Sequence, residues 1–263
     1  LVQGTHLVLR RPFVETAFLV QVPGDERIVF LIPWYGRTLL GTTETTIHGD
    51  PGRAEVRDEE RRYLLRAVSA VLNEPPQEDD VVGAYVGVRA LKERPGRSAT
   101  ALSRDFAVEE PARGLWLAVG GKLTTARADA ARMVDRLVPA PDGESPTLSQ
   151  VLPGGDIPHL GELERELWDR GRRLQLDEDV VDALLFRHGS EARLRLDEID
   201  AQPALAKRLH PELPFARVEL EHALAHEDCH TVDDALRRRL PLSILGGVSD
   251  GLREEVRQRL EGP

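Results

Sequence analysis

Residues Leu115–Arg127 read LWLAVGGKLTTAR, and this stretch decides how the chain around it is organised. Five apolar residues typical of a strand end at Gly120-Gly121, and apolar residues then recur at helical spacing over Leu123–Leu137. Glycines let a backbone approach a ligand closely, and a helix N-terminus offers unpaired N–H donors. The stretch therefore predicts a strand, a glycine turn and a helix. The turn suits an anion or an electron-rich carbonyl, although a plain tight turn would use the same glycines.

Upstream of this corner, short apolar segments alternate with turns that contain Gly, Pro and Asp. Such segments are typical of strands, and their tight turns indicate an antiparallel meander. Between them, Ala54–Leu72 places its apolar residues largely on one face and predicts an amphipathic helix that ends near Pro75-Pro76. The expected strands span residues 5–10, 16–22, 27–32, 37–43, 81–88, 97–108 and 115–119.

Downstream, the chain gathers prolines and glycines over residues 139–157, which predicts a linker. Beyond it the strand signals vanish and helical periodicity dominates, so a small all-helical domain is expected over residues 158–263. The helical patterns cover Leu160–Leu174, Asp179–His188, Val218–His226 and Val232–Leu240.

Composition limits the function classes. The chain has 263 residues, a formal charge of -10 and basic residues mixed with acidic ones, which argues against nucleic acid as a partner. The single cysteine, Cys229, excludes an internal disulfide and suits a reducing, cytoplasmic compartment. No apolar run approaches the roughly 20 residues of a membrane span, and residues 1–6 lack the charged n-region and long apolar h-region that are typical of a signal peptide.

The string Gly120-Gly121-Lys122-Leu123-Thr124-Thr125 resembles the motif that closes the flavin site in the FAD-dependent glycerol-3-phosphate dehydrogenase and α-glycerophosphate oxidase family. Other segments resemble motifs of that family in the same order, although Ala90 stands where the family usually has proline. These segments are Gly4-Thr5-His6, Ile32-Pro33-Trp34 followed by Gly41-Thr42-Thr43-Glu44, Gly87-Val88-Arg89-Ala90-Leu91 and Ser103-Arg104-Asp105-Phe106.

The resemblance implies an α+β fold. An antiparallel-sheet substrate domain over residues 1–114 would be followed by the closing strand and helix of an FAD-binding domain over 115–138. The linker over 139–157 and the helical domain over 158–263 would complete the chain, with Arg187-His188-Gly189 resembling part of the family's helical cap.

The resemblance also implies a reaction, the oxidation of sn-glycerol 3-phosphate to dihydroxyacetone phosphate by hydride transfer to FAD. Arg89 and Arg104 are the expected phosphate ligands, because guanidinium groups bind phosphate oxygens bidentately. His6 is the expected base for the hydroxyl proton. Lys122 and the following helix N-terminus would stabilise negative charge on the reduced flavin. The expected flavin-binding residues are Gly120, Gly121, Lys122, Leu123, Thr124 and Thr125.

One family feature is missing from this sequence. The strand–Gly-x-Gly-x-x-Gly–helix unit that holds the FAD pyrophosphate does not occur. We therefore expect a fragment of a roughly twofold longer flavoprotein that, isolated, neither retains stoichiometric FAD nor turns over. The sequence leaves open whether electrons pass to quinone or oxygen, whether the protein contacts the inner face of a membrane peripherally, and whether it is a homodimer.

Two other hypotheses for the function of this chain compete with the flavoenzyme. His226-Glu227-x-x-His230 formally matches a zinc hydrolase motif, which needs both imidazoles on one face of a continuous helix. However, Thr231 and Asp234 resemble a capping box that starts a helix directly after His230, so no metal site is expected. In the other reading the helical domain is a non-catalytic interaction module, and its Arg237–Arg239 run is a solvated face.

Overall fold

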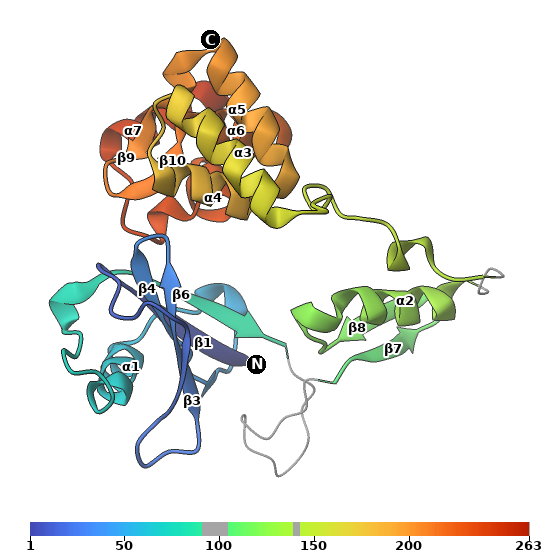
Figure 1. The fold of residues 1–263 in the computed structure, drawn as a ribbon. Helices are drawn as coiled ribbons and strands as arrows, with labels where there is room; N and C mark the ends of the chain where they lie inside the picture. The colour runs from blue at the N-terminus through green and yellow to red at the C-terminus, as the bar shows by residue number, and fades with distance from the viewer. Residues whose placement is uncertain (91–104, 139–142, 263) are drawn as a thin grey trace.

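The computed structural model describes residues 1–90, 105–138 and 143–262. Figure 1 shows a sheet with one helix, a small hairpin-and-helix unit, and a mainly helical C-terminal domain. The α+β class expected from the sequence is confirmed.

The sheet has six antiparallel strands arranged around β1 (Val2–Leu9). On one side of β1 lie β4 (Arg37–Gly41) and the two-residue β5 (Thr45–Thr46), and on the other lies β6 (Val81–Arg89). Outside β4 follow β3 (Ile28–Trp34) and β2 (Phe18–Gln21), which form the expected meander.

Alternation along the strands gives the sheet two different faces. One face carries Leu7, Leu9, Leu31 and Leu40, which pack with Leu64 and Val68 of helix α1 (Asp58–Ser69). The helix is shorter than the predicted 54–72 because the extended residue Arg57 precedes it. The opposite face carries His6 and Val8, which alternate with Leu7 and Leu9 along β1.

A smaller unit follows, in which β7 (Ala107–Ala112) pairs with β8 (Leu115–Val119) and leads into helix α2 (Ala126–Leu137). The predicted strand–glycine turn–helix corner is therefore present. Residues 97–104 of the predicted strand over 97–108 lie outside the described residues, and β7 begins only at Ala107.

The C-terminal domain contains helices α3 (Leu160–Arg173), α4 (Glu178–His188), α5 (Ala192–Ala201), α6 (Arg217–His226) and α7 (Asp250–Glu261). The predicted helix over 232–240 forms a π-helix at Asp234–Arg239. The expectation that strands vanish here is wrong in detail, because β9 (Arg208–His210) pairs with β10 (Leu213–Ala216). Both strands are too short to produce a periodic signal, and Pro214 interrupts the second.

The C-terminal domain packs on one end of the sheet face opposite α1. Val8 belongs to the same buried cluster as Leu213, Phe215 and Leu245. A Cβ built on Gly83 of β6 would lie 1.9 Å from the carbonyl oxygen of Ile244, so only glycine permits this approach. The C-terminal domain therefore covers the Val8 end of the face and leaves the His6 end uncovered by this contact.

Candidate functional site

His6 lies in a row of residues that crosses five strands of the sheet. Backbone pairing places Leu19 beside Phe30, Phe30 beside Gly41, Gly41 beside His6, and His6 beside Tyr85. Directly paired residues point to the same face, so the row shares the face opposite α1. The pairing brings together segments that are about 80 residues apart in the sequence.

The imidazole of His6 is held between its two neighbours. Its ring stacks on Tyr85 with centroids 4.8 Å apart and planes at 5°. A Cβ on Gly41 would lie 2.3 Å from His6 Cδ2, so glycine at this position makes room for the ring. Burial, with a smaller contribution from the charge of Arg89, lowers the pKa of His6 to about 4. His6 is therefore neutral at physiological pH and able to accept a proton.

Arg89 lies on the same face as His6, because Arg89 pairs with Val2 and Tyr85 pairs with His6 along the same two strands. Its Nη1 donates a hydrogen bond to Glu44 Oε1 at 3.2 Å. Both side chains line a pocket of 850 Å³ whose apolar wall includes Ile28 and Phe30. Arg27 also lines it, but its guanidinium is paired with Asp25.

The loop that carries Glu44 is anchored from the other side of the sheet. Glu60, which is 6% exposed, accepts hydrogen bonds from the hydroxyls of Thr5, Thr43 and Thr45, all at 2.8 Å. Burial alone would raise the pKa of Glu60, but these bonds and one from Gln3 outweigh it and lower the pKa. No pattern in the sequence marks this carboxylate, which ties α1 to the strand end beside the pocket.

The glycine turn that the sequence predicts to bind flavin is largely exposed. Gly120 and Gly121 adopt φ of +76° and +89°, values that favour glycine. Leu123 is 94% exposed, and Lys122 and Thr124 are also exposed. Figure 1 shows the unit that contains this turn, formed by β7, β8 and α2, apart from the six-stranded sheet. The structure therefore groups His6 with Arg89 and presents the turn separately, while Arg104 lies outside the described residues.

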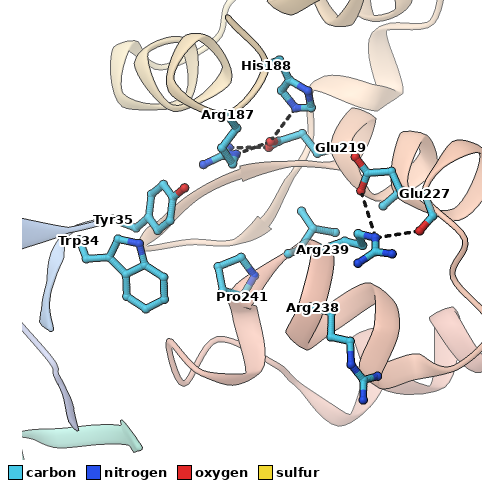
Figure 2. A pocket seen from close by; sticks show the side chains of 11 residues that line it. Trp34, Tyr35, Arg187, His188, Glu219, Glu227, Arg238, Arg239 and Pro241 are labelled. Carbon is cyan, nitrogen blue, oxygen red and sulfur yellow. Dashed lines mark hydrogen bonds and ion pairs between the residues drawn. The ribbon is translucent and has the colours of Figure 1, made fainter. Parts of the chain in front are cut away.

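A second pocket, of 390 Å³, lies where Trp34 and Tyr35 of the sheet meet the C-terminal domain (Figure 2). Its charged groups are largely engaged with one another. Arg187 is bound bidentately by Glu219 at 2.5 and 2.7 Å, and Arg239 Nε donates to the carbonyl of Glu227 at 2.7 Å. This pocket is thus part of the contact between the domains.

Arg187 is the centre of that contact. Its guanidinium lies 5.1 Å from the Tyr35 ring centroid and 4.2 Å from that of Phe215. Burial would raise the pKa of Glu219, but hydrogen bonds and charge from His188 and Arg187 lower it, so the carboxylate stays ionised. In the sequence, Arg187 stands out only through its resemblance to a family motif, and no pattern marks Glu219.

The zinc-hydrolase reading is not supported by the geometry. Helix α6 ends at His226, and His230 Nε2 instead contacts Asp228 at 2.7 Å. Thr231 and Asp234 exchange the hydrogen bonds of a capping box, as the sequence predicted. Among the described residues, no group of three or more His, Cys, Asp or Glu side chains is arranged to hold a metal.

Arg237, Arg238 and Arg239 are all exposed, and Arg238 and Arg239 also pair with Asp234 and Glu227. Within residues 1–90, 105–138 and 143–262, no helix is both long and apolar enough to span a bilayer.

Comparisons with known proteins match both parts of the chain. Residues 1–136 match the family described as FAD dependent oxidoreductase, and residues 145–258 match the C-terminal domain of alpha-glycerophosphate oxidase. The chain is 32% identical to the aerobic glycerol-3-phosphate dehydrogenase of Escherichia coli, over 99% of this chain and 54% of the relative. It is 30% identical to a glycerol-3-phosphate dehydrogenase of Synechocystis, over 92% of this chain and 45% of the relative.

A solved structure shares the fold. It is the glycerol-3-phosphate dehydrogenase of Bacillus halodurans complexed with FAD, with a TM-score of 0.69 and 23% sequence identity over 99% of this chain and 55% of that one. The chain thus spans about half the length of the relatives it matches. Taken with the two family matches, these similarities show that the chain belongs to the FAD-dependent oxidoreductases, in the family of the glycerol-3-phosphate dehydrogenases.

Proposed function

We propose that this chain supplies the substrate side of an enzyme that oxidises sn-glycerol 3-phosphate to dihydroxyacetone phosphate. The observation that carries the proposal is the placement of a neutral histidine, His6, and a cation, Arg89, on one face of the sheet beside a pocket. A base and a phosphate ligand are the two groups that this oxidation requires of the protein. The names of the relatives support the substrate.

The residues present fit FAD as cofactor. The turn from Gly120 to Thr125 offers glycines with positive φ and an exposed helix start, where backbone N–H groups and the helix dipole favour negative charge. We place the pyrimidine end of the flavin against this turn, with Lys122 as the adjacent cation. FAD, when bound, accepts the hydride from C2 of the substrate and passes the electrons to a quinone or to oxygen.

Arg89, together with Arg104, holds the substrate phosphate, and Glu44 orients the Arg89 guanidinium from the side. His6 takes the proton of the C2 hydroxyl as the hydride leaves. Tyr85 and Gly41 fix the plane of the imidazole, so that its position does not depend on the substrate. The apolar wall at Phe30 helps to exclude water from the reacting carbon.

Substrate binding is expected to raise the pKa of His6. The pKa starts near 4, mainly because the ring is buried and to a smaller extent because Arg89 repels the imidazolium. A phosphate dianion on Arg89 cancels that repulsion and favours the protonated ring, which shifts the pKa toward the ordinary value of about 6.5. NMR titration of His6 with and without saturating glycerol 3-phosphate measures this. In Arg89→Gln the unliganded pKa should already be higher, and an unchanged wild-type pKa on ligand binding would contradict the assignment.

Replacing Arg89 should change substrate preference more than general activity. In a flavin-loaded protein extended at its N-terminus, Arg89→Lys should lower kcat/KM for glycerol 3-phosphate by about tenfold or more, because a point charge replaces a bidentate ligand. The kcat/KM for glycerol, which has no phosphate, should change much less. Arg27→Lys is the matched control, since Arg27 lines the same pocket but is held by Asp25. Equal losses for both substrates would indicate a structural role for Arg89.

The proposed function is tested with two purified proteins. One is this 263-residue chain, and the other is extended at its N-terminus by a segment that corresponds to the part of the relatives that this chain does not span. Flavin absorbance is measured first, and glycerol-3-phosphate-dependent dye reduction second. We expect flavin and turnover in the extended protein and neither in the 263-residue chain. An extended protein that folds without flavin would overturn the proposal.

A further inference from the structure

A buried carboxylate lies directly behind the glycine turn. Asp129, in the first turn of α2, is only 5% exposed although most of its helix faces solvent. Nothing in the proposed reaction uses it so far. A buried carboxylate next to an otherwise open turn requires a physical reason, because burying a charge is costly unless hydrogen bonds and charges compensate it.

The contacts of Asp129 converge on the turn. Its Oδ2 lies 2.6 Å from the hydroxyl oxygen of Thr125, and that same oxygen lies 3.3 Å from the backbone nitrogen of Lys122. A threonine hydroxyl has one proton to donate. The hydroxyl oxygen also lies 3.1 Å from the carbonyl oxygen of Lys122, but because the shorter contact is to a carboxylate, we assign the proton to Asp129. The hydroxyl oxygen then faces the Lys122 N–H as an acceptor, which makes a relay from Lys122 through Thr125 to Asp129.

The carboxylate also limits the space beside Gly121. A Cβ added at Gly121 would lie 3.0 Å from Asp129 Oδ2 and 3.5 Å from Phe106 Cδ2. Arg132, which forms an ion pair with Asp129, lies over the Phe106 ring at 5.1 Å. The carboxylate is therefore enclosed by Gly121, Thr125 and a guanidinium that offsets its charge.

We propose that Asp129 is a positioning residue for the flavin: through Thr125 it holds Lys122 and Gly121 in the conformation that receives the pyrimidine end of the ring. This inference rests on the proposed function. Without the relay the turn has two adjacent residues with positive φ and few other restraints, so the ligand would have to order it on binding. Arg132 has a separate task, which is to keep the charge of Asp129 from opposing negative charge on the reduced flavin.

The test uses the extended, flavin-binding protein and measures its dissociation constant for FAD. Asp129→Asn should weaken FAD binding by about tenfold, as expected when a charge-assisted hydrogen bond becomes a neutral one. Thr125→Val, which breaks the relay from the other side, should have a similar effect, and the double variant should be no worse than either single one. Thr125→Ser keeps the hydroxyl and should bind FAD nearly as the wild type does.

Arg132→Gln provides a readout that a merely structural role would not move. It leaves the relay intact and removes the compensating charge, so it should lower the midpoint potential of the bound flavin while changing FAD affinity less than Asp129→Asn does. Unchanged affinity in Asp129→Asn, or additive losses in the double variant, would overturn the inference.

The two proposals fail in different ways. A folded wild-type extended protein without flavin removes the proposed function, whereas flavin binding that is indifferent to Asp129 and Thr125 removes only the positioning role. If Asp129→Asn does not fold, the comparison of Thr125→Val with Thr125→Ser decides the question.

Discussion

In the flavin-loaded extended protein, His6→Gln should lower kcat for glycerol 3-phosphate by about 10²–10⁴, the usual contribution of a general base. Glutamine keeps a polar side chain of similar size but cannot take a proton near neutral pH. The flavin spectrum should be unchanged, because His6 belongs to the substrate side of the site. Stopped-flow reduction of the flavin measures the effect directly, since it isolates the oxidation step from later electron transfer.

Two further variants separate the chemistry of His6 from its position. His48→Gln alters an exposed histidine beyond β5 and should leave the rate unchanged. Gly41→Ala keeps the imidazole but introduces a Cβ whose position lies 2.3 Å from His6 Cδ2, so it should displace the ring and lower kcat as well. A His6→Gln protein that reduces its flavin at the wild-type rate would exclude His6 as the base.

The dependence of folding stability on pH, measured by denaturant unfolding between about pH 4 and 8, provides an independent check on the burial of His6. The folded, unliganded chain keeps His6 neutral down to a pH near 4, whereas an unfolded chain protonates this side chain near 6.5. Since the folded state binds fewer protons between those values, the contribution of His6 to stability is present above pH 6.5 and is lost as the pH falls toward 4.

Local pattern was sufficient to predict the meander, helix α1 and the corner at Gly120-Gly121, because each is specified by alternation, periodicity or turn residues within about 20 positions. The neighbours of His6 could not be derived in this way. The row from Leu19 to Tyr85 depends on which strands pair and in which register, and that is decided by the whole sheet. His6 itself was selected by family resemblance alone.

Buried polar residues were the main omission at the sequence level. Asp129, Glu60 and Glu219 look like ordinary charged positions on amphipathic helices, and each is buried only because a specific partner lies opposite it. The partner of Asp129 is Thr125, one helical turn away. The partners of Glu60 include Thr43, which follows β4, and the partner of Glu219 is Arg187, 32 residues earlier in the sequence. Single-sequence periodicity carries no signal for such pairs, so only the assembled structure reveals them.

Glu219→Gln should destabilise the fold by about 3–5 kcal/mol, because removing one partner of a buried ion pair leaves the other charge uncompensated. Glu219 is 3% exposed and is the bidentate partner of Arg187 (Figure 2). The Arg187 guanidinium also lies against the rings of Tyr35 and Phe215. Arg187 has no other carboxylate within ion-pair distance among the described residues. For a chain of this size, such a loss lowers Tm by about 6–20 °C.

Glu166→Gln is the matched control for that prediction. Glu166 also binds an arginine bidentately, Arg193, at 2.6–3.0 Å, but its side chain is 40% exposed. Solvent-exposed pairs contribute about 0–1 kcal/mol, so this variant should melt within a few degrees of the wild type. If stability depends on the uncompensated charge of Arg187, then Arg187→Met combined with Glu219→Leu should recover much of the Glu219→Gln loss. Differential scanning calorimetry measures the Tm of each variant. Equal Tm losses in Glu219→Gln and Glu166→Gln would show that burial of the Arg187–Glu219 pair does not control the contact between the sheet and the C-terminal domain.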